Sequence, residues 1–292
     1  MRIIRYLDAE DRPAVAVADD DGRVRPLPVP SLADLLGAPL ADIRAVVESA
    51  AAAATPLPAT RLPGGPPRIL APVDGRTEVW ASGVTYQRSR EARVEESGDG
   101  DVYTRVYDAV RPELFFKSVA WRAVGDGDPI GVRADSDSNT PEPELALVLN
   151  AAAELVGLTI CDDVSSRTIE GENPLYLPQA KVYTASCALG PGIRPIWEIG
   201  DPTDLAISCT ITRDGEPVWS ARTSTAMLHR RLDDLVEHLY RALAFPYGAI
   251  LSTGTGIVPG LDLSLRDGDV VRIEIDGIGT LTNPVIRVPA AG

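Results

Sequence analysis

The sequence predicts an α+β fold that is rich in strands. The chain of 292 residues contains 25 glycines and 25 prolines, and this number of turn-forming residues implies many short elements. Aromatic residues make up only 5% of the chain, so the core must rely on Val, Leu, Ile and Ala. Short apolar runs bounded by turn residues recur along the sequence, which is the pattern of strands. A hydrophobic content of 45% is ample for a core at this length.

The charge balance limits the classes of partner. The formal net charge of −14 opposes non-specific attraction to nucleic acid or to anionic membranes, and no stripe of basic and aromatic residues is present. An anionic substrate would therefore need a metal ion or a few local cations. The three cysteines are scattered and lack CxxC spacing, which favours buried free thiols in a reducing compartment. No apolar run approaches the length of a membrane span, and we expect a cytoplasmic protein.

The first 70 residues predict a small α+β domain. Ser31 is placed to cap a short helix that runs to Leu36, and Pro39 to begin a second helix that ends near residue 53. Three strands precede these helices, at residues 2–7, 14–18 and 24–27. The proline-rich segment 55–67 suits a linker rather than a regular element. We therefore predict a boundary near residue 70, with domains at 1–70 and 71–292.

The second domain begins with strands on either side of a long polar segment. We expect strands at residues 79–85 and 112–117. Between them, residues 86–110 mix arginines with glutamates and include the polar run 97–101, which predicts an exposed helix followed by a loop. A long polar insertion beside a site is typical of a lid, and a solvated surface helix is the alternative.

The run Pro141-Glu142-Pro143-Glu144 is the strongest chemical signal. Side chains alternate along a strand, so Glu142 and Glu144 project from the same face. Like charges this close are unfavourable unless a proton or a cation lies between them. The next apolar strand, at residues 155–161, leads directly to Asp163, and three hard oxygen ligands suit Mg²⁺. The alternative is a solvated strand edge, although prolines are unusual in a purely structural strand.

Two later features add candidate groups. Lys181 lies between apolar neighbours, where burial would lower its pKa and make it chemically useful; a solvated lysine is the alternative. The loop at residues 250–260 is rich in glycine and hydroxyl groups. It is suited to present backbone N–H groups and the Thr255 hydroxyl to a carboxylate.

The last third of the chain predicts strands and one long helix. A hairpin is expected from residues 205–213, through Asp214-Gly215, to a return strand near 218–220. The next segment, 225–244, carries leucines on one face of a helix. Both histidines of the chain, His229 and His238, fall in this segment among charged surface residues, so hydrolysis by a Ser-His-Asp or Cys-His arrangement is not expected. Further strands are predicted at 270–275 and at the end of the chain, near residue 288.

Taken in order, four sequence boxes resemble the fumarylacetoacetate hydrolase family over about residues 70–290. The boxes are Glu142-x-Glu144, Asp162-Asp163-Val-Ser-Ser-Arg167, Lys181 before Cys187-Ala-Leu-Gly-Pro191, and Ser252-Thr-Gly-Thr255. The resemblance implies a mixed β-sandwich roll that binds a divalent metal through Glu142, Glu144 and Asp163. It also implies that Lys181 is the active-site lysine and that Thr255 binds the substrate carboxylate.

The match departs from the hydrolytic members of that family at one point. They usually carry a histidine after an Asn-Tyr pair near the start of the domain, whereas residues 84–90 read Val-Thr-Tyr-Gln-Arg-Ser-Arg. Residues 171–183 resemble instead the branch of 2-keto-3-deoxy-D-arabinonate dehydratases, in which Glu113 also matches a catalytic position. Dehydration of a 2-keto-3-deoxy sugar acid is therefore the expected reaction.

Chemistry supports this expectation, because the carboxylate and keto oxygens of such an acid can chelate one Mg²⁺, which acidifies the C3 proton and stabilises an enolate. Mn²⁺ and Ca²⁺ are alternatives to Mg²⁺. Lys181 and Glu113 would form the acid–base pair, in an order that the sequence leaves open. Thr255 and the Gly254 N–H would hold the carboxylate. A pentonate would give 2,5-dioxopentanoate.

Several further expectations complete the interpretation. Arg90 and Glu172 are additional candidates for recognition of substrate hydroxyl groups. One alternative function is hydrolysis of acylpyruvates or 1,3-diketo acids on the same metal, with a glutamate in place of the missing histidine. Another alternative is a sugar-acid-binding protein without catalysis. The resemblance also implies a homodimer or a homotetramer, and no partner among nucleic acids or membranes is expected.

Overall fold

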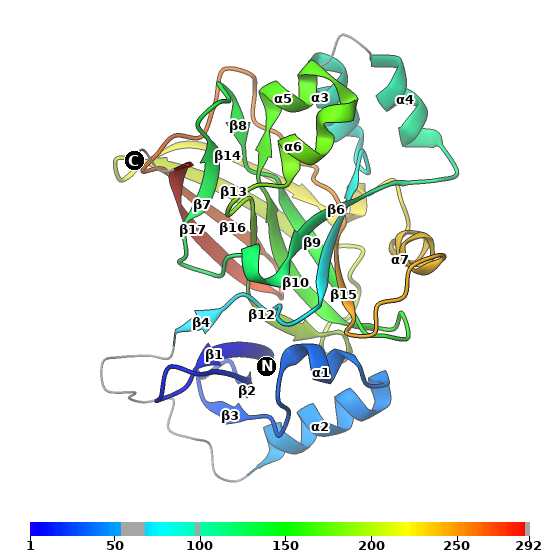
Figure 1. Cartoon of the computed structure of the whole chain (residues 1–292), viewed down its shortest axis with the longest axis vertical. Coiled ribbons are helices and arrows are strands. Elements are labelled where there is room, and N and C mark those ends of the chain that lie inside the picture. The colour runs from blue at the N-terminus through cyan, green and yellow to red at the C-terminus, as the bar shows by residue number, and fades with distance from the viewer. Residues whose placement is uncertain (54–67, 97–99, 290–292) are drawn as a thin grey trace.

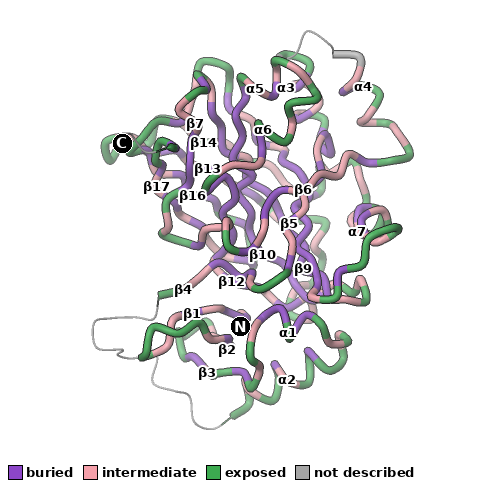
Figure 2. The backbone as a smooth tube through the Cα atoms, in the orientation of Figure 1, coloured by how far each residue is buried: buried purple, intermediate pink, exposed green. Residues whose placement is uncertain are grey.

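The computed structural model describes residues 1–53, 68–96 and 100–289. Within them, the largest feature is a ten-stranded sheet with the order β3-β2-β1-β12-β10-β9-β15-β5-β6, in which β4 pairs with β1 (Figure 1). Its strands are β1 (Arg2–Leu7), β2 (Pro13–Ala18), β3 (Val24–Pro26), β4 (Ile69–Leu70), β5 (Glu78–Gly83), β6 (Glu113–Val119), β9 (Pro143–Leu149), β10 (Leu155–Asp163), β12 (Cys187–Pro195) and β15 (Ala249–Ser252). The central strands β9 and β10 are buried along almost their whole length (Figure 2).

A second sheet of the described chain has five strands in the order β14-β13-β16-β17-β7. They are β7 (Ile130–Arg133), β13 (Ala206–Arg213), β14 (Glu216–Ser224), β16 (Val270–Ile275) and β17 (Gly279–Val288). Apolar side chains of β13 and β16 alternate inward and join the side chains of β9 and β10 in one hydrophobic cluster. Both sheets therefore share a core, and the predicted strand-rich α+β fold is confirmed.

The N-terminal residues continue the large sheet rather than forming a sheet of their own. β1 pairs with β12 at Ile3 and Ile193, and β4 pairs back onto β1. Two helices cover this end, α1 (Leu32–Leu36) and α2 (Leu40–Ala52), and the Ser31 hydroxyl accepts the Asp34 N–H to cap α1 as predicted. Their buried side chains share a core with β9, β10 and β15. The boundary near residue 70 stays a prediction, and the expected linker at 55–67 lies outside the described residues.

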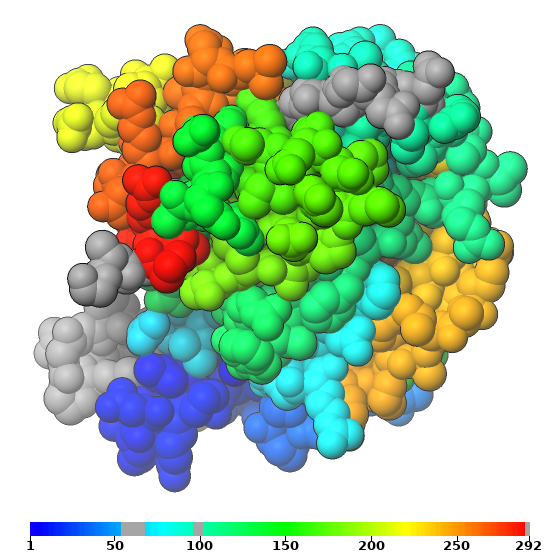
Figure 3. All heavy atoms as spheres, turned by 45° about the horizontal axis from the view of Figure 1, so that its top comes forward, coloured from blue at the N-terminus to red at the C-terminus, as the bar shows by residue number. Residues whose placement is uncertain are grey.

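The polar segment between β5 and β6 forms two helices, α3 (Gln87–Glu96) and α4 (Gly100–Asp108). They lie at the same end of the molecule as α5 (Arg167–Glu172) and α6 (Leu177–Lys181), and α3 packs against α5 (Figure 1). The two-residue strands β8 (Asn139–Thr140) and β11 (Ser165–Ser166) pair nearby. Figure 3, which brings this end forward, shows the yellow-green atoms of α5 and α6 beside the teal atoms of α3 and α4. Three residues of the predicted loop, 97–99, lie outside the described residues.

The helix predicted at residues 225–244 is wrong at both ends. The helix α7 spans only Leu232–Tyr240, and residues 225–227 form a single 3-10 turn. Between them, Leu228 bridges to Tyr86 and the His229 N–H donates to the Thr85 carbonyl at 2.9 Å. These tertiary contacts override the helical pattern, so His229 lies outside α7 while His238 lies within it. In the described part of the chain, no helix is both long and apolar enough to cross a bilayer.

Candidate metal and active site

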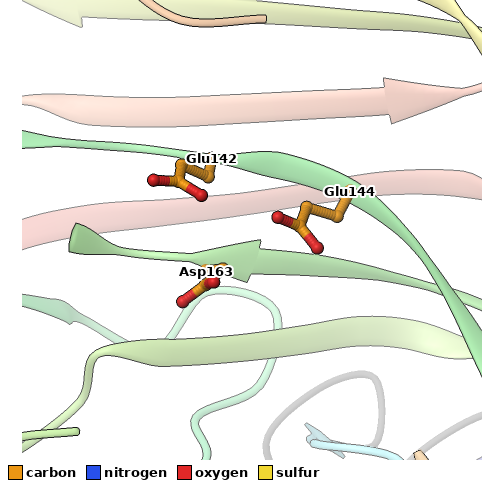
Figure 4. A group of neighbouring side chains, drawn as sticks. All are labelled: Glu142, Glu144 and Asp163. Atoms are coloured by element: carbon orange, nitrogen blue, oxygen red, sulfur yellow. The ribbon is translucent and has the colours of Figure 1, made fainter. Parts of the chain in front are cut away.

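Three carboxylates meet at the ends of β9 and β10. Glu142 directly precedes β9, Glu144 lies within it, and Asp163 ends β10. The antiparallel register places Glu144 opposite Cys161, and the Asp163 N–H donates to the Glu142 carbonyl at 3.0 Å. One oxygen of each carboxylate lies within 4.8 Å of the others, and Figure 4 shows the three side chains turned toward a common space. The predicted grouping is therefore present.

The protein surroundings do not neutralise this cluster completely. Burial raises the pKa of Glu144 well above its ordinary value, and the charges of Asp163 and Glu142 raise it further. The Glu144 Oε2 accepts hydrogen bonds from the Ser252 hydroxyl at 2.6 Å and the Gly254 N–H at 2.7 Å. A divalent cation would relieve the repulsion among the three carboxylates, two of them buried and Glu142 partly exposed, and oxygen donors of this kind suit Mg²⁺. The residues present therefore fit a divalent metal.

Lys181, the last residue of α6, contacts two of the three carboxylates. Its Nζ lies 2.8 Å from a Glu142 oxygen and 3.1 Å from an Asp163 oxygen, and 5.6 Å from the centre of the Phe115 ring. Burial alone would lower the pKa of Lys181, but the charges of Asp163 and Glu142 outweigh it, so the pKa is raised. The predicted burial of this lysine is confirmed, and its predicted lowered pKa is wrong because the carboxylates surround it.

A second lysine, Lys117 on β6, was not predicted as a site residue, because in the sequence it is only the last residue of the apolar strand expected at 112–117. It is fully buried, and its Nζ lies 2.5 Å from the Asp163 Oδ1. The same ammonium donates to the backbone carbonyls of Val164 at 3.0 Å and Lys181 at 2.6 Å. One signal was available: the chain contains only two lysines and otherwise uses arginine for its cations. Both lysines lie at this cluster.

Glu113, the first residue of β6, lies opposite Gly83 of β5. Its Oε2 is shielded from solvent and has no hydrogen-bond partner among the described residues. Burial raises the pKa of Glu113, and the nearby Arg93 opposes this effect. A Cβ atom at residue 83 would lie 2.2 Å from the Glu113 Oε2, so only glycine leaves room for this carboxyl group.

An ion pair between Arg93 on α3 and Glu170 on α5 lines the cavity around the three carboxylates. Both side chains are buried, and the Glu170 Oε1 lies 3.8 Å from the Lys181 Nζ. This pair was not predicted as part of the site, because its members are 77 positions apart and meet only through the packing of α3 on α5. The pair places one charge of each sign beside Lys181.

The loop after β15 contacts the site differently from the prediction. The Gly254 N–H is directed to Glu144, as described above, so it orients one of the three carboxylates. The Thr255 hydroxyl donates to the Pro143 carbonyl at 2.9 Å and accepts the Ile257 N–H at 3.1 Å. Both residues line the site cavity. Their predicted binding of a substrate carboxylate stays a prediction.

Arg90 and Glu172 are not brought into this group. The Arg90 guanidinium lies over the Tyr107 ring, 4.7 Å from its centre, and Glu172 is exposed at the end of α5. Neither lines the cavity around the carboxylates. No histidine of the described residues lines that cavity either; His229 stacks on Tyr107, with ring centres 4.1 Å apart.

The fold and the site together define a metal-binding enzyme built on mixed β-sheets, with two buried lysines beside three carboxylates that fit a divalent metal. Comparison with known proteins gives a more specific assignment. The chain belongs to the fumarylacetoacetate hydrolase family, because the family model described as "Fumarylacetoacetate (FAA) hydrolase C-terminal" matches residues 78–286. The resemblance drawn from the four sequence boxes is thereby confirmed.

Two curated relatives are dehydratases by name. The chain is 51% identical over 217 residues to "Probable 2-keto-3-deoxyxylonate dehydratase" of Haloferax volcanii, covering 74% of each protein. It is 46% identical over 222 residues to "2-dehydro-3-deoxy-D-arabinonate dehydratase" of Saccharolobus solfataricus, covering 75% of this chain and 74% of the relative. A solved structure of "2-keto-3-deoxy-D-arabinonate dehydratase complexed with magnesium and 2,5-dioxopentanoate" matches with a TM-score of 0.84 and 36% identity, over 98% of this chain and 99% of that one.

Proposed function

We propose that this protein dehydrates a 2-keto-3-deoxy sugar acid, with a five-carbon acid as substrate and 2,5-dioxopentanoate as product, and that it uses Mg²⁺. The observation that carries the proposal is the group of three carboxylates with Lys181 against it and Glu113 nearby. Its similarity to named dehydratases over about three quarters of the chain supports the same reaction.

Glu142, Glu144 and Asp163 would hold the metal, with Mn²⁺ or Ca²⁺ as substitutes. The bound ion would act as a Lewis acid toward the oxygens of a 2-keto acid. Neighbouring side chains orient these carboxylates. The Ser165 hydroxyl donates to Glu142 at 2.8 Å, and Lys117 forms an ion pair with Asp163. Each ligand is thus fixed by a neighbour that the chain itself supplies.

Lys181 and Glu113 would move the protons. Dehydration breaks the C3–H bond and the C4–O bond, and the electron pair from C3 forms the new double bond while the C4 hydroxyl leaves as water. One group must accept the C3 proton and another must protonate the leaving hydroxyl. Lys181 lies against the carboxylates, where C1 to C3 would bind, and Glu113 has an unpartnered oxygen beyond them. The elimination product is a 2-oxo acid with a C3=C4 double bond and a C5 hydroxyl. Loss of a C5 proton and protonation at C3 convert it to the C5 enol, which tautomerises to the aldehyde of 2,5-dioxopentanoate.

Four further residues are proposed to bind the substrate. Thr255 and the Gly254 N–H would contact the carboxylate, which requires them to exchange their present contacts with Pro143 and Glu144. Arg90 and Glu172 would contact hydroxyl groups, and both would have to approach the cavity to do so. The lid hypothesis for residues 86–111 would supply that movement for Arg90.

The experiment that tests this function compares substrate classes. The purified protein is incubated with Mg²⁺ and either a 2-keto-3-deoxy-pentonate or an acylpyruvate. We expect aldehyde product from the first and no loss of diketone absorbance with the second. Hydrolysis of the acylpyruvate alone would favour the hydrolase alternative, and tight binding of the sugar acid without turnover at saturating Mg²⁺ would favour a binding protein.

We further propose a cytoplasmic homodimer or homotetramer. The assembly is supported by the family resemblance. The compartment is supported by three free, buried cysteines in the described chain. Light scattering on the purified protein tests the assembly: a mass of two or four times that of the chain is expected, and a monomer at working concentration would contradict it.

A further inference from the structure

A side cavity adjoins the carboxylate cluster on the side of Glu113. It has a volume of about 70 Å³, and it shares two lining residues, Arg93 and Glu170, with the space around the metal ligands. Glu113 lines it as well, and the Oε2 of this residue is buried without a hydrogen-bond partner among the described residues. A buried carboxyl oxygen without a partner indicates a ligand group that binds there, because an unsatisfied buried acceptor is costly.

Apolar side chains make up much of the wall of the side cavity. Val102 and Val106 of α4 line it together with Leu177, the first residue of α6, and Tyr103 and Pro174 complete the lining. A hydroxyl group placed against Val102, Val106 or Leu177 would lose its hydrogen bonds to water, because these side chains offer no replacement.

Contacts with the rest of the molecule hold the α4 part of this wall in place. The Arg230 guanidinium donates to the Val106 carbonyl at 2.8 Å. The next residue, Tyr107, stacks on His229 with ring centres 4.1 Å apart. The Arg90 guanidinium also lies over the Tyr107 ring, 4.7 Å from its centre. Figure 1 shows α4 at the outer side of this end of the molecule. The wall is thus attached to two other segments.

We propose that this side cavity binds the C4–C5 end of the substrate and that Val102, Val106 and Leu177 limit the substrate to five carbons. The inference rests on the proposed dehydratase function and adds to it the residues that select chain length. With C1 to C3 at the carboxylate cluster, C4 and its hydroxyl lie next to Glu113, and the terminal hydroxymethyl group fills the cavity.

The size of the cavity agrees with this assignment. A single water requires on the order of 10–15 Å³ of such space, so about 70 Å³ holds roughly five to seven groups of water size. The C4 hydroxyl, C5 and the C5 hydroxyl are three such groups and fit within it. A six-carbon acid adds a carbon and a further hydroxyl, and its terminal hydroxyl would then lie against Val102, Val106 and Leu177 without a hydrogen-bond partner in those side chains. One additional methylene in a fitted pocket changes kcat/KM by roughly 10- to 200-fold, so discrimination of at least about tenfold is expected.

The test compares five-carbon and six-carbon 2-keto-3-deoxy acids on wall variants and matched controls. Val106→Ala and Leu177→Ala enlarge the cavity, whereas Val110→Ala and Leu175→Ala remove the same atoms from side chains that are 90% and 83% exposed. We expect wild type to prefer the pentonate at least about tenfold in kcat/KM, and the wall variants to reduce this preference at least about fivefold. The controls should keep the wild-type ratio.

A second measurement requires no turnover. Calorimetry measures the affinity of a series of unreactive 2-oxo acids in saturating Mg²⁺, and this affinity reports the chain length that the side cavity accepts. The series is 2-oxobutanoate, 2-oxopentanoate, 2-oxohexanoate and 2-oxoheptanoate. Wild-type affinity should be highest at five carbons and should fall at six, and in the wall variants the maximum should move to six or seven.

The outcomes separate the two proposals. Equal use of both sugar acids by wild type, or an unchanged preference in wall variants that remain active, would overturn the length assignment while the dehydratase function stands. An absence of any dehydration by wild type would refute the proposed function. In that case the calorimetric series still decides whether the side cavity selects chain length. An affinity maximum at the same chain length in wild type and in the wall variants would overturn the inference.

Discussion

Replacing the buried Lys117 with methionine should destabilise the protein strongly. The ammonium group donates to the carbonyls of Val164 and Lys181, and it forms an ion pair with Asp163, whose Oδ1 lies 2.5 Å away. Methionine has a similar length and fills the space, so little of the loss arises from packing. The loss arises from a buried carboxylate that keeps only one of its two lysine partners, Lys181, and from two carbonyls without a donor.

The expected magnitude is about 3–5 kcal/mol in the free energy of unfolding, which is the usual result of removing one partner of a buried ion pair. Urea unfolding of wild type and Lys117→Met measures it in metal-free buffer. The exposed cation Arg44, which pairs with Glu48 on α2, provides the control: Arg44→Met should cost less than about 1 kcal/mol.

A double-mutant cycle assigns the loss to the pair. Asp163→Asn combined with Lys117→Met should be less destabilised than the sum of the single variants, with a coupling of about 1–3 kcal/mol. The reasoning would be refuted by a Lys117→Met protein within about 1 kcal/mol of wild type, or by effects of the two substitutions that simply add.

Three further predictions concern the reaction. Lys181→Met and Glu113→Gln should each lower kcat by at least about 100-fold while calorimetric Mg²⁺ binding persists; near-normal kcat in either would remove that residue from the acid–base pair. Gly83→Ala should impair turnover, because the new Cβ would displace the Glu113 carboxyl group. The control Gly200→Ala, with no atom within 4 Å of the new Cβ, should keep wild-type activity. Equal activity of the two variants would count against a catalytic role of Glu113. Arg93→Gln removes the main influence that opposes the raised pKa of Glu113, so the Glu113 limb of the pH–rate profile should move to higher pH. A rising limb identifies Glu113 as the base and a falling limb identifies it as the acid, and a profile that does not move would exclude Glu113 as its source.

The sequence was sufficient to group the three carboxylates because their grouping depends on local rules. Alternation along one strand places Glu142 and Glu144 on one face, and the next strand in an antiparallel pair returns Asp163 to the same end. The same local rules gave the α1 cap at Ser31 and the hairpin at Asp214 and Gly215, which both have positive φ.

The parts that the sequence did not predict depend on contacts between distant segments. Arg93 and Glu170 meet because α3 packs on α5, which no local pattern indicates. The helical pattern at 225–244 fails because Leu228 pairs with Tyr86. The pKa of Lys181 is raised rather than lowered, because its neighbours in space are carboxylates that its sequence neighbours do not reveal.

The most direct test of the central claim is the position of a bound metal. Crystals grown with Mn²⁺ and a 2-oxo acid can be measured by anomalous scattering at the manganese edge. We expect one strong peak at about 2.1 Å from an oxygen of each of Glu142, Glu144 and Asp163, with oxygens of the acid completing the shell. A peak elsewhere in the molecule, or none at saturating Mn²⁺, would contradict the proposed site.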